Sequence, residues 1–214
     1  SLKSAGVDFS ILGNDEGCTG DPARRAGNEY LFDLLALRNA ELFKEKSIIK
    51  IVTHCPHCFN SLKNEYSEFG VELDVIHHSE LLEHLVKNGK SIGKSKEPGN
   101  VVYHDSCYLG RHNKLYDAPR EVVAHNSESG KALDVDASRE RGTCCGAGGG
   151  RFLLEEKTGV RMSHQRVDQL MESNPDTIAV SCPFCVLMLE DALKAKNLQD
   201  TVKVKDISEL ANEA

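Results

Sequence analysis

The sequence lacks several features that would place it in a common class. No apolar run approaches the roughly 18 residues that a membrane-spanning helix requires, and no basic-then-apolar leader opens the chain. Basic residues do not predominate, because 33 acidic side chains against 26 basic ones give a formal charge of −7. Phosphate contacts need clustered Lys and Arg. We therefore expect no direct membrane span and no nucleic-acid partner.

Three chemical motifs are also missing. The glycine-rich loop after Gly146 has Arg151 where a dinucleotide-binding loop would place its last glycine, and no Gly-Lys-Ser or Gly-Lys-Thr follows. No ferredoxin-type C-x-x-C-x-x-C run occurs, so any further relay clusters must lie on another segment or partner. Tryptophan is absent, which disfavours a thioredoxin-like dithiol motif.

The sequence does contain cysteines, and they occur in groups. Eight cysteines in 214 residues are too few for a secreted disulfide scaffold, and their grouping indicates metal or redox chemistry in a reducing compartment. We therefore expect a cytoplasmic protein, held at the cytoplasmic membrane face only through a partner. The groups are Cys18, the C-P-x-C motif Cys55 to Cys58, Cys107, the pair Cys144 and Cys145, and the C-P-x-C motif Cys182 to Cys185.

The two C-P-x-C motifs lie 127 positions apart, as do Cys18 and Cys145, which predicts an internal repeat. Each motif follows a β-branched run and precedes a helical pattern, a short strand and a Ser-Glu-Leu helix start. This order is typical of an α/β fold, here two pseudo-repeated Rossmann-like βαβ units with mainly parallel sheets. The expected strands are 48–53, 73–76, 101–104, 177–181 and 202–204, and the closing helices start at 79 and 208.

The repeats divide the chain into three parts. Residues 1–90 form a first repeat, 91–100 a Lys-, Ser- and Gly-rich linker, and 101–214 a complete second repeat. The second repeat opens with a strand that leads into Cys107, and the counterpart of Cys107 would lie before Ser1. The first repeat therefore lacks its opening strand and first cysteine, and we expect it to begin inside the repeat with a strand around residues 7–12.

The second repeat carries the pattern C-x36-C-C-G-x35-C-x-x-C. This pattern resembles the cysteine-rich CCG domain of heterodisulfide reductases and related iron–sulfur oxidoreductases. The likeness is strongest to the C-terminal part of membrane-associated iron–sulfur oxidoreductases linked to electron-transfer flavoprotein. It covers nearly the whole chain and rests on three stretches, which are Cys18-Thr19-Gly20-Asp21-Pro22-Ala23-Arg24-Arg25, His54-Cys55-Pro56-His57-Cys58 and Tyr103-His104-Asp105-Ser106-Cys107-Tyr108-Leu109-Gly110-Arg111.

The resemblance implies a noncubane [4Fe–4S] cluster in the second repeat, held by the five sulfurs of Cys107, Cys144, Cys145, Cys182 and Cys185. Pro183 suits the first turn of a helix, whose positive end would favour thiolate at the second C-P-x-C motif. Gly146 and Gly148 would let backbone N–H groups approach the cluster, and Arg151 would offset part of its negative charge.

The first repeat departs from the pattern, because either Gly17 or Thr19 stands where the second adjacent cysteine would be. Cys18, Cys55 and Cys58 supply three thiolates, one short of the four that a cubane cluster needs. We expect a second [4Fe–4S] cluster there, completed by an outside ligand. His54, His57 or an open site are the alternatives.

The resemblance implies an iron–sulfur oxidoreductase that transfers electrons between a flavoprotein or ferredoxin and a quinone or disulfide acceptor. The expected partner is an upstream segment or another chain with further redox centres, and a flavoprotein is a second candidate. His104 and Arg111 are candidate catalytic residues, although His104 also suits a supporting or turn-capping role. The alternatives are a zinc-stabilised, non-catalytic interaction module and a thiol–disulfide oxidoreductase.

Overall fold

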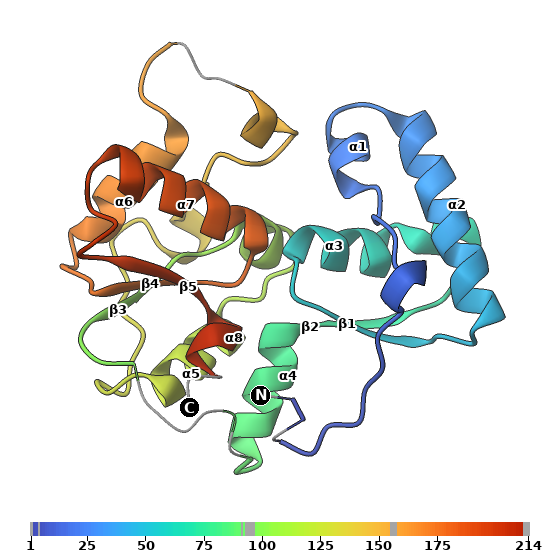
Figure 1. The fold of residues 1–214 in the computed structure, drawn as a ribbon, viewed down its shortest axis with the longest axis horizontal. Helices are drawn as coiled ribbons and strands as arrows, with labels where there is room; N and C mark the ends of the chain where they lie inside the picture. The colour runs from blue at the N-terminus through green and yellow to red at the C-terminus, as the bar shows by residue number, and fades with distance from the viewer. Residues whose placement is uncertain (1, 4, 91, 93–96, 155–157, 212–214) are drawn as a thin grey trace.

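The computed structural model describes residues 2–3, 5–90, 92, 97–154 and 158–211, and shows two α/β units side by side (Figure 1). The helices are α1 (Asp21–Arg25), α2 (Glu29–Glu45), α3 (Pro56–Asn64), α4 (His78–Lys87), α5 (Asp117–Asn126), α6 (Met162–Met171), α7 (Pro183–Ala195) and α8 (Ile207–Leu210). The strands are β1 (Lys50–Thr53), β2 (Asp74–His77), β3 (Val101–Tyr103), β4 (Thr177–Val180) and β5 (Lys203–Asp206).

The first unit contains a two-stranded parallel sheet in which Lys50 of β1 aligns with Asp74 of β2. A core of apolar side chains from α2, α3 and the turn after α3 stabilises this unit, with Phe32, Phe59 and Tyr66 fully buried. Strand β1 is only partly covered, and Val52 is 46% exposed. The first sheet therefore has a less protected side at β1.

The second unit contains a three-stranded parallel sheet in the order β3-β4-β5. The central strand β4 is buried at every position, as expected for a parallel strand with helices on both faces. One face packs against α6 and α7, and the other against α5 and α8. Short connections place the carboxyl ends of β3 and β4 at the same edge, where Cys107 and Cys182 follow them.

The structure confirms the predicted α/β fold with two small parallel sheets. Strand β1 and helix α3 in the first unit correspond to β4 and α7 in the second, and each helix starts with the proline of a C-P-x-C motif. The expected strand at residues 7–12 is wrong, because this segment has no regular secondary structure and pairs with neither sheet. Four of its six residues are exposed, including Ile11 at 79%, so it lacks the burial that stabilises a strand.

Helix α4 joins the two units. It belongs to the first repeat by sequence, yet Leu82 and Leu85 pack in the same core as Val122 of α5 and Leu210 of α8. Part of the expected linker, residues 91 and 93–96, lies outside the described residues. Because α4 is shared in this way, the two repeats are expected to unfold together rather than as separate domains.

Candidate metal centre

The cysteines of both C-P-x-C motifs lie where a parallel strand ends and a helix begins. Cys55 precedes α3 and Cys182 precedes α7, and both have extended backbone followed by proline at the first helical position. The free N–H groups of a helix N-terminus favour negative charge at that place. The repeated fold therefore delivers two pairs of thiols to equivalent, anion-stabilising positions.

The second-repeat cysteines converge in three dimensions. Cys144 Sγ lies 4.0 Å from Cys107 Sγ, and Cys145 Sγ lies 3.4 Å from Cys185 Sγ. Cys182 interacts with Cys185 as well. The five sulfurs named from the sequence thus form one group, and Cys145, Cys182 and Cys185 are at most 4% exposed.

In the first repeat, Cys55 and Cys58 form a pair. Cys58 interacts with Cys55, and the hydroxyl of Thr19 donates a hydrogen bond of 3.4 Å to Cys58 Sγ. Cys18 is exposed and its sulfur accepts a hydrogen bond from the backbone N–H of Gly20. All eight cysteines lie within the described residues, and none of them forms a disulfide.

Hydrogen bonds from backbone N–H groups to sulfur indicate which cysteines of the two repeats correspond. The N–H of Gly20 donates to Cys18 Sγ over 3.4 Å, and the N–H of Gly146 donates to Cys144 Sγ over 3.3 Å. Both glycines have a left-handed backbone, with φ of 85° and 92°. Of the two alignments that the sequence left open, this geometry favours the one in which Cys18 is the counterpart of Cys144 and Thr19 stands in the place of Cys145.

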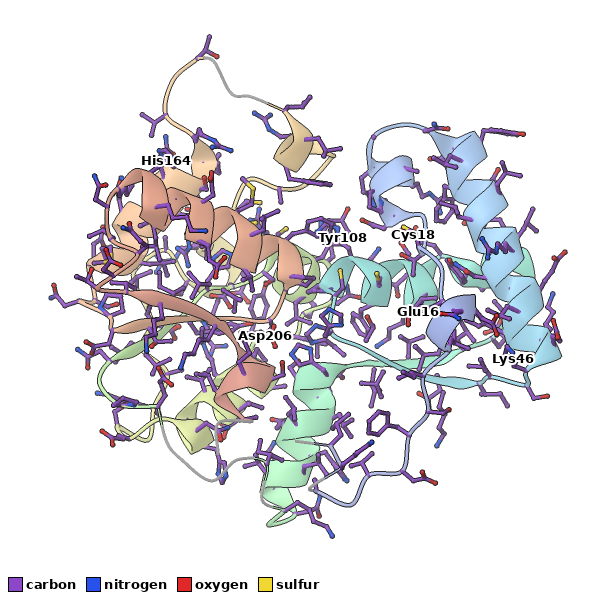
Figure 2. All side chains as sticks on the ribbon, in the orientation of Figure 1. Glu16, Cys18, Lys46, Tyr108, His164 and Asp206 are labelled. Carbon is purple, nitrogen blue, oxygen red and sulfur yellow. The ribbon has the colours of Figure 1, made fainter. Side chains whose placement is uncertain are left out.

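The two groups of thiols meet at the junction between the units, because Cys55 of the first repeat interacts with Cys182 of the second. Aromatic rings fill the space beside them. The ring centroid of His57 lies 4.1 Å from that of Tyr108 and 5.2 Å from that of Phe184. Each of these residues is next to a cysteine in the sequence, and Figure 2 shows Tyr108 between the two units.

A buried ionic network anchors the first-repeat side of this junction. Asp21 is 1% exposed, and its carboxylate pairs with His57 Nδ1 at 2.8 Å and Arg25 Nε at 2.9 Å. Burial opposes ionisation of Asp21, but the hydrogen bonds from His57 and Arg25 outweigh it and lower its pKa. The Nδ1 atom of His57 is therefore engaged by Asp21, while His54 is exposed and its backbone oxygen contacts the ring of His77.

Contacts among the thiols lower the pKa of some of them and raise the pKa of others. The hydrogen bond with Cys107 and then that with Cys145 lower the pKa of Cys144, while contact with Cys144 raises the pKa of Cys145 to about 12. Cys182 behaves like Cys144, since hydrogen bonds with Cys185, Cys55 and the backbone lower its pKa. Contact with Cys145, and then contact with Cys182, raises the pKa of Cys185.

The other predicted residues have different surroundings. His104 is fully buried and lies next to Cys145 and Cys185, whereas Arg111 is exposed and donates a 2.9 Å hydrogen bond to the Gly142 carbonyl. Arg111 therefore supports the loop before Cys144. Gly148 has open space around it, with no heavy atom within 4 Å of the place a Cβ would take. Its contact with a cluster stays a prediction.

Sequence reasoning missed the role of Arg166. Its guanidinium is fully buried and contacts His104, although α6 reads as an ordinary amphipathic helix. No local signal marks Arg166, because its partner lies 62 positions away. The role of Thr19 was detectable, because Cys-Thr-Gly differs from Cys-Cys-Gly at one position.

The donor set fits an iron–sulfur cluster. Thiolates are the soft ligands that such clusters use, and clustered thiols cannot all ionise unless bound metal neutralises them. In agreement with this, the contact between Cys107 and Cys144 lowers the pKa of Cys144 and raises that of Cys107. The fold and the site thus define a doubled, cysteine-rich α/β protein of the thiolate metal-binding class.

The comparison with protein families is consistent with this class. The family model described as a cysteine-rich domain, CCG, matches residues 2–63 and again residues 101–190. The chain belongs to this CCG cysteine-rich domain family. It is therefore an iron–sulfur protein whose CCG cysteines bind a cluster.

Three relatives carry names that describe iron–sulfur or heterodisulfide chemistry. The chain is 47% identical over 209 residues to the probable iron-sulfur-binding oxidoreductase FadF of Bacillus subtilis, with 98% of this chain and 30% of that protein covered. It is 44% identical to the EtfAB:quinone oxidoreductase of Syntrophomonas wolfei, again with 98% and 30% covered. It is 35% identical to one polypeptide of the dihydromethanophenazine:CoB--CoM heterodisulfide reductase of Methanosarcina barkeri, with 100% and 53% covered.

The chain thus spans about a third to a half of the length of these relatives. Each relative therefore contains further segments that this chain does not match. Among the described helices of this chain, none combines the length and apolarity that crossing a membrane requires.

Proposed function

We propose that this chain is the electron-transferring part of a heterodisulfide-reductase-like iron–sulfur oxidoreductase. In this proposal Cys107, Cys144, Cys145, Cys182 and Cys185 hold a noncubane [4Fe–4S] cluster. Cys18, Cys55 and Cys58 hold a second [4Fe–4S] cluster with a ligand from outside the chain. A bound cluster would accept and release single electrons.

The observation that supports this proposal is the contact between Cys55 and Cys182. It brings a ligand of each site together at the junction of the repeats. Two redox centres that share such a junction are suited to pass electrons between them, whereas a zinc-stabilised module has no need to join its sites. The protein's own contribution is burial, since both thiols are at most 7% exposed.

For the reaction partners we propose a flavoprotein or ferredoxin as donor and a quinone or disulfide as acceptor. Electrons leave the reduced donor one at a time. A quinone becomes a quinol by taking up two electrons and two protons, and a disulfide becomes two thiols by the same uptake. The names of the relatives, which include a quinone oxidoreductase and a heterodisulfide reductase, support both acceptor classes.

We also propose that an upstream segment or a partner chain completes the first repeat. Strand β4 pairs with β3 on one side and β5 on the other, but its counterpart β1 pairs with β2 alone among the described strands. An added parallel strand at β1 would cover that edge and bring one cysteine beside Cys18, as β3 brings Cys107. A partner of this kind would also account for any attachment to the cytoplasmic face of a membrane.

The direct test is metal and acid-labile sulfide analysis of the anaerobically purified chain. We expect about four irons and matching sulfide at the second repeat, with broad absorbance near roughly 400 nm that dithionite bleaches. Reoxidation by a short-chain ubiquinone would then be compared with reoxidation by a linear disulfide. Stoichiometric zinc without sulfide would overturn the proposal.

A further inference from the structure

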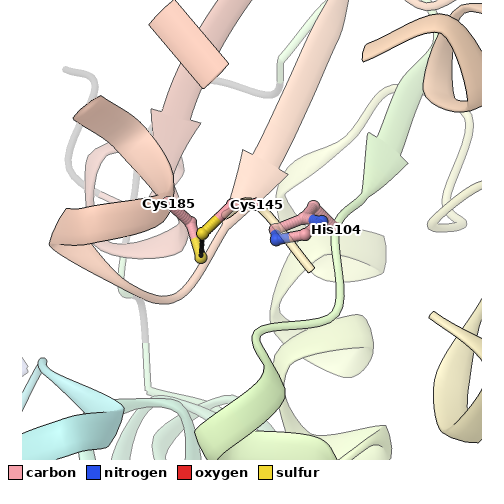
Figure 3. A group of neighbouring side chains, drawn as sticks. All are labelled: His104, Cys145 and Cys185. Atoms are coloured by element: carbon pink, nitrogen blue, oxygen red, sulfur yellow. Dashed lines mark hydrogen bonds between the residues drawn. The ribbon is translucent and has the colours of Figure 1, made fainter. Parts of the chain in front are cut away.

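His104 lies against the second-repeat thiols and has an unused polar atom. It is fully buried, and one of its ring nitrogens lies within 4.8 Å of the sulfurs of Cys145 and Cys185. Figure 3 shows a ring nitrogen of His104 on the side of these sulfurs. Within the described residues, Nε2 of His104 has no hydrogen-bond partner. Leaving a buried polar atom without a hydrogen-bond partner costs free energy. We therefore expect a partner of Nε2 on the side of the thiols.

The opposite nitrogen of the ring determines what Nε2 can do. Arg166 Nε lies 3.0 Å from His104 Nδ1. A guanidinium has only donors, so Nδ1 must accept with its lone pair. A neutral imidazole with a bare Nδ1 carries its proton on Nε2. Because the Nδ1 lone pair is taken up by Arg166 Nε–H, the ring holds only the one proton on Nε2 and is neutral.

This arrangement differs from that of a metal-binding histidine. A histidine that binds metal through Nε2 needs its lone pair there and donates its other N–H to a carboxylate, carbonyl or water. Here Nδ1 faces a donor instead. The trio of His104, Cys145 and Cys185 therefore has the spacing of a metal site but the wrong hydrogen-bonding pattern at the histidine.

The position of Arg166 is fixed by contacts of its own. Its Nη1 donates to the Ala137 carbonyl at 2.8 Å and to Gln169 Oε1 at 3.2 Å. In the described part of the chain, Arg166 forms no ion pair with a carboxylate, and burial lowers its pKa despite attraction to Asp105 and Cys185. A buried cation without a paired carboxylate is costly unless another anion lies nearby, and thiolates with a bound cluster would provide that charge.

We propose that Arg166 positions His104 as the Nε2–H tautomer, and that this N–H donates a hydrogen bond to sulfur at the Cys145 and Cys185 side of the cluster site. The inference rests on the proposed cluster in the second repeat. His104 is a hydrogen-bond donor to the site, not a ligand, and Arg166 is its positioning residue. A donor of this kind stabilises the more negative, reduced state and so raises the reduction potential.

The test compares two substitutions of the same histidine. His104→Leu removes the donor, whereas the amide nitrogen of His104→Gln can replace Nε2–H. In anaerobic redox titrations followed by electron paramagnetic resonance, we expect His104→Leu to keep its iron and shift the midpoint potential to more negative values. His104→Gln should restore much of the shift, and His125→Leu, at an exposed position on α5, should change nothing.

Two results would overturn the inference. One is an unchanged midpoint potential in His104→Leu. The other is loss of iron from both His104 variants to the extent seen in Cys145→Ser, which would make His104 a ligand. If the wild-type protein contains zinc and no sulfide, the proposed function is wrong. The tautomer of His104 can still be measured in that zinc-containing protein.

Nitrogen-15 NMR of the histidine-labelled protein as purified supplies that second measurement. We expect the His104 ring to show a protonated Nε2 and a bare Nδ1 in the wild type. In Arg166→Lys, which keeps the charge but loses the Nε–H, the tautomers should mix. A protonated Nδ1 in the wild type would contradict the inference, whichever metal is bound.

Discussion

The hydroxyl of Thr19 lies 3.4 Å from the sulfur of Cys58, and the sulfur of Cys145 lies at the same distance from that of Cys185. The first repeat thus has the same distance at this place as the second repeat, but Thr19 has a hydroxyl where Cys145 has a thiol. A threonine hydroxyl does not ionise near neutral pH, so it cannot replace a thiolate ligand. This one exchange makes the two metal sites of the chain unequal.

The first prediction concerns Thr19→Cys. The substitution gives the first repeat a fourth thiol within this chain, at the position that Cys145 occupies in the second. We expect anaerobically reconstituted protein to gain roughly one further [4Fe–4S] complement of iron and sulfide. Thr19→Ser, which keeps the hydroxyl, serves as the matched control. Equal iron in the two variants would contradict the alignment of Thr19 with Cys145.

The second prediction compares Cys145→Ser with Cys18→Ser. Only the second repeat has a full set of cysteines in this chain, so Cys145→Ser should remove most of the iron–sulfur absorbance. Cys18→Ser should leave most of it. Both changes replace sulfur by oxygen in a side chain of similar size, and spectra of air-free preparations make the comparison. Equal losses would show that the two repeats load alike.

The third prediction concerns completion of the first site. Because β1 pairs only with β2 among the described strands, we expect the chain alone to underload the site of Cys18, Cys55 and Cys58. Adding the preceding segment of a relative such as FadF, in one polypeptide, should raise iron at that site. Mass measurement with metal analysis provides the readout. A stable monomer of this chain with both sites full would refute the expectation.

The fourth prediction concerns acid stability at the contact between the units. Asp206 accepts a 3.0 Å hydrogen bond from His78 Nε2, and burial of the carboxylate is outweighed by this bond, so the pKa of Asp206 is lowered. A depressed pKa contributes stability above the unfolded value, near 3.9, and that stability is lost as the pH falls through the folded pKa. Asp206→Asn should therefore weaken the dependence of unfolding on pH below about 4.

At neutral pH the same variant should lose about 1 kcal/mol of unfolding free energy, since asparagine keeps an Oδ1 acceptor for His78 but removes the charge that strengthens this bond. Asparagine keeps an oxygen for the N–H of Ser208, which caps α8, so the helix cap is retained. Asp200→Asn, at an exposed position, is the control. Denaturant titrations at several pH values measure both effects, and a pH profile like that of the wild type would contradict the prediction.

Much of the fold was predictable because it depends on short-range patterns. The β-branched run before Cys182 and the proline after it specify a strand end and a helix start through local backbone preferences. The same signals occur before and after Cys55, so the repeat could be found without any tertiary information. Residues 7–12 were mistaken for a strand because an apolar pattern identifies no pairing partner, and pairing is decided at long range.

The sequence by itself determined the doubled α/β architecture, the cysteine class of the site and the shortage of thiols in the first repeat, because these follow from residue type, spacing and local propensity. The tertiary structure favoured Thr19 over Gly17 as the counterpart of Cys145, and it alone showed that Cys55 interacts with Cys182 and that Arg166 contacts His104. Each of these relationships joins residues far apart in the chain, or depends on a one-residue shift between repeats. Only the packing of α3, α6 and α7 around the junction brings such groups together.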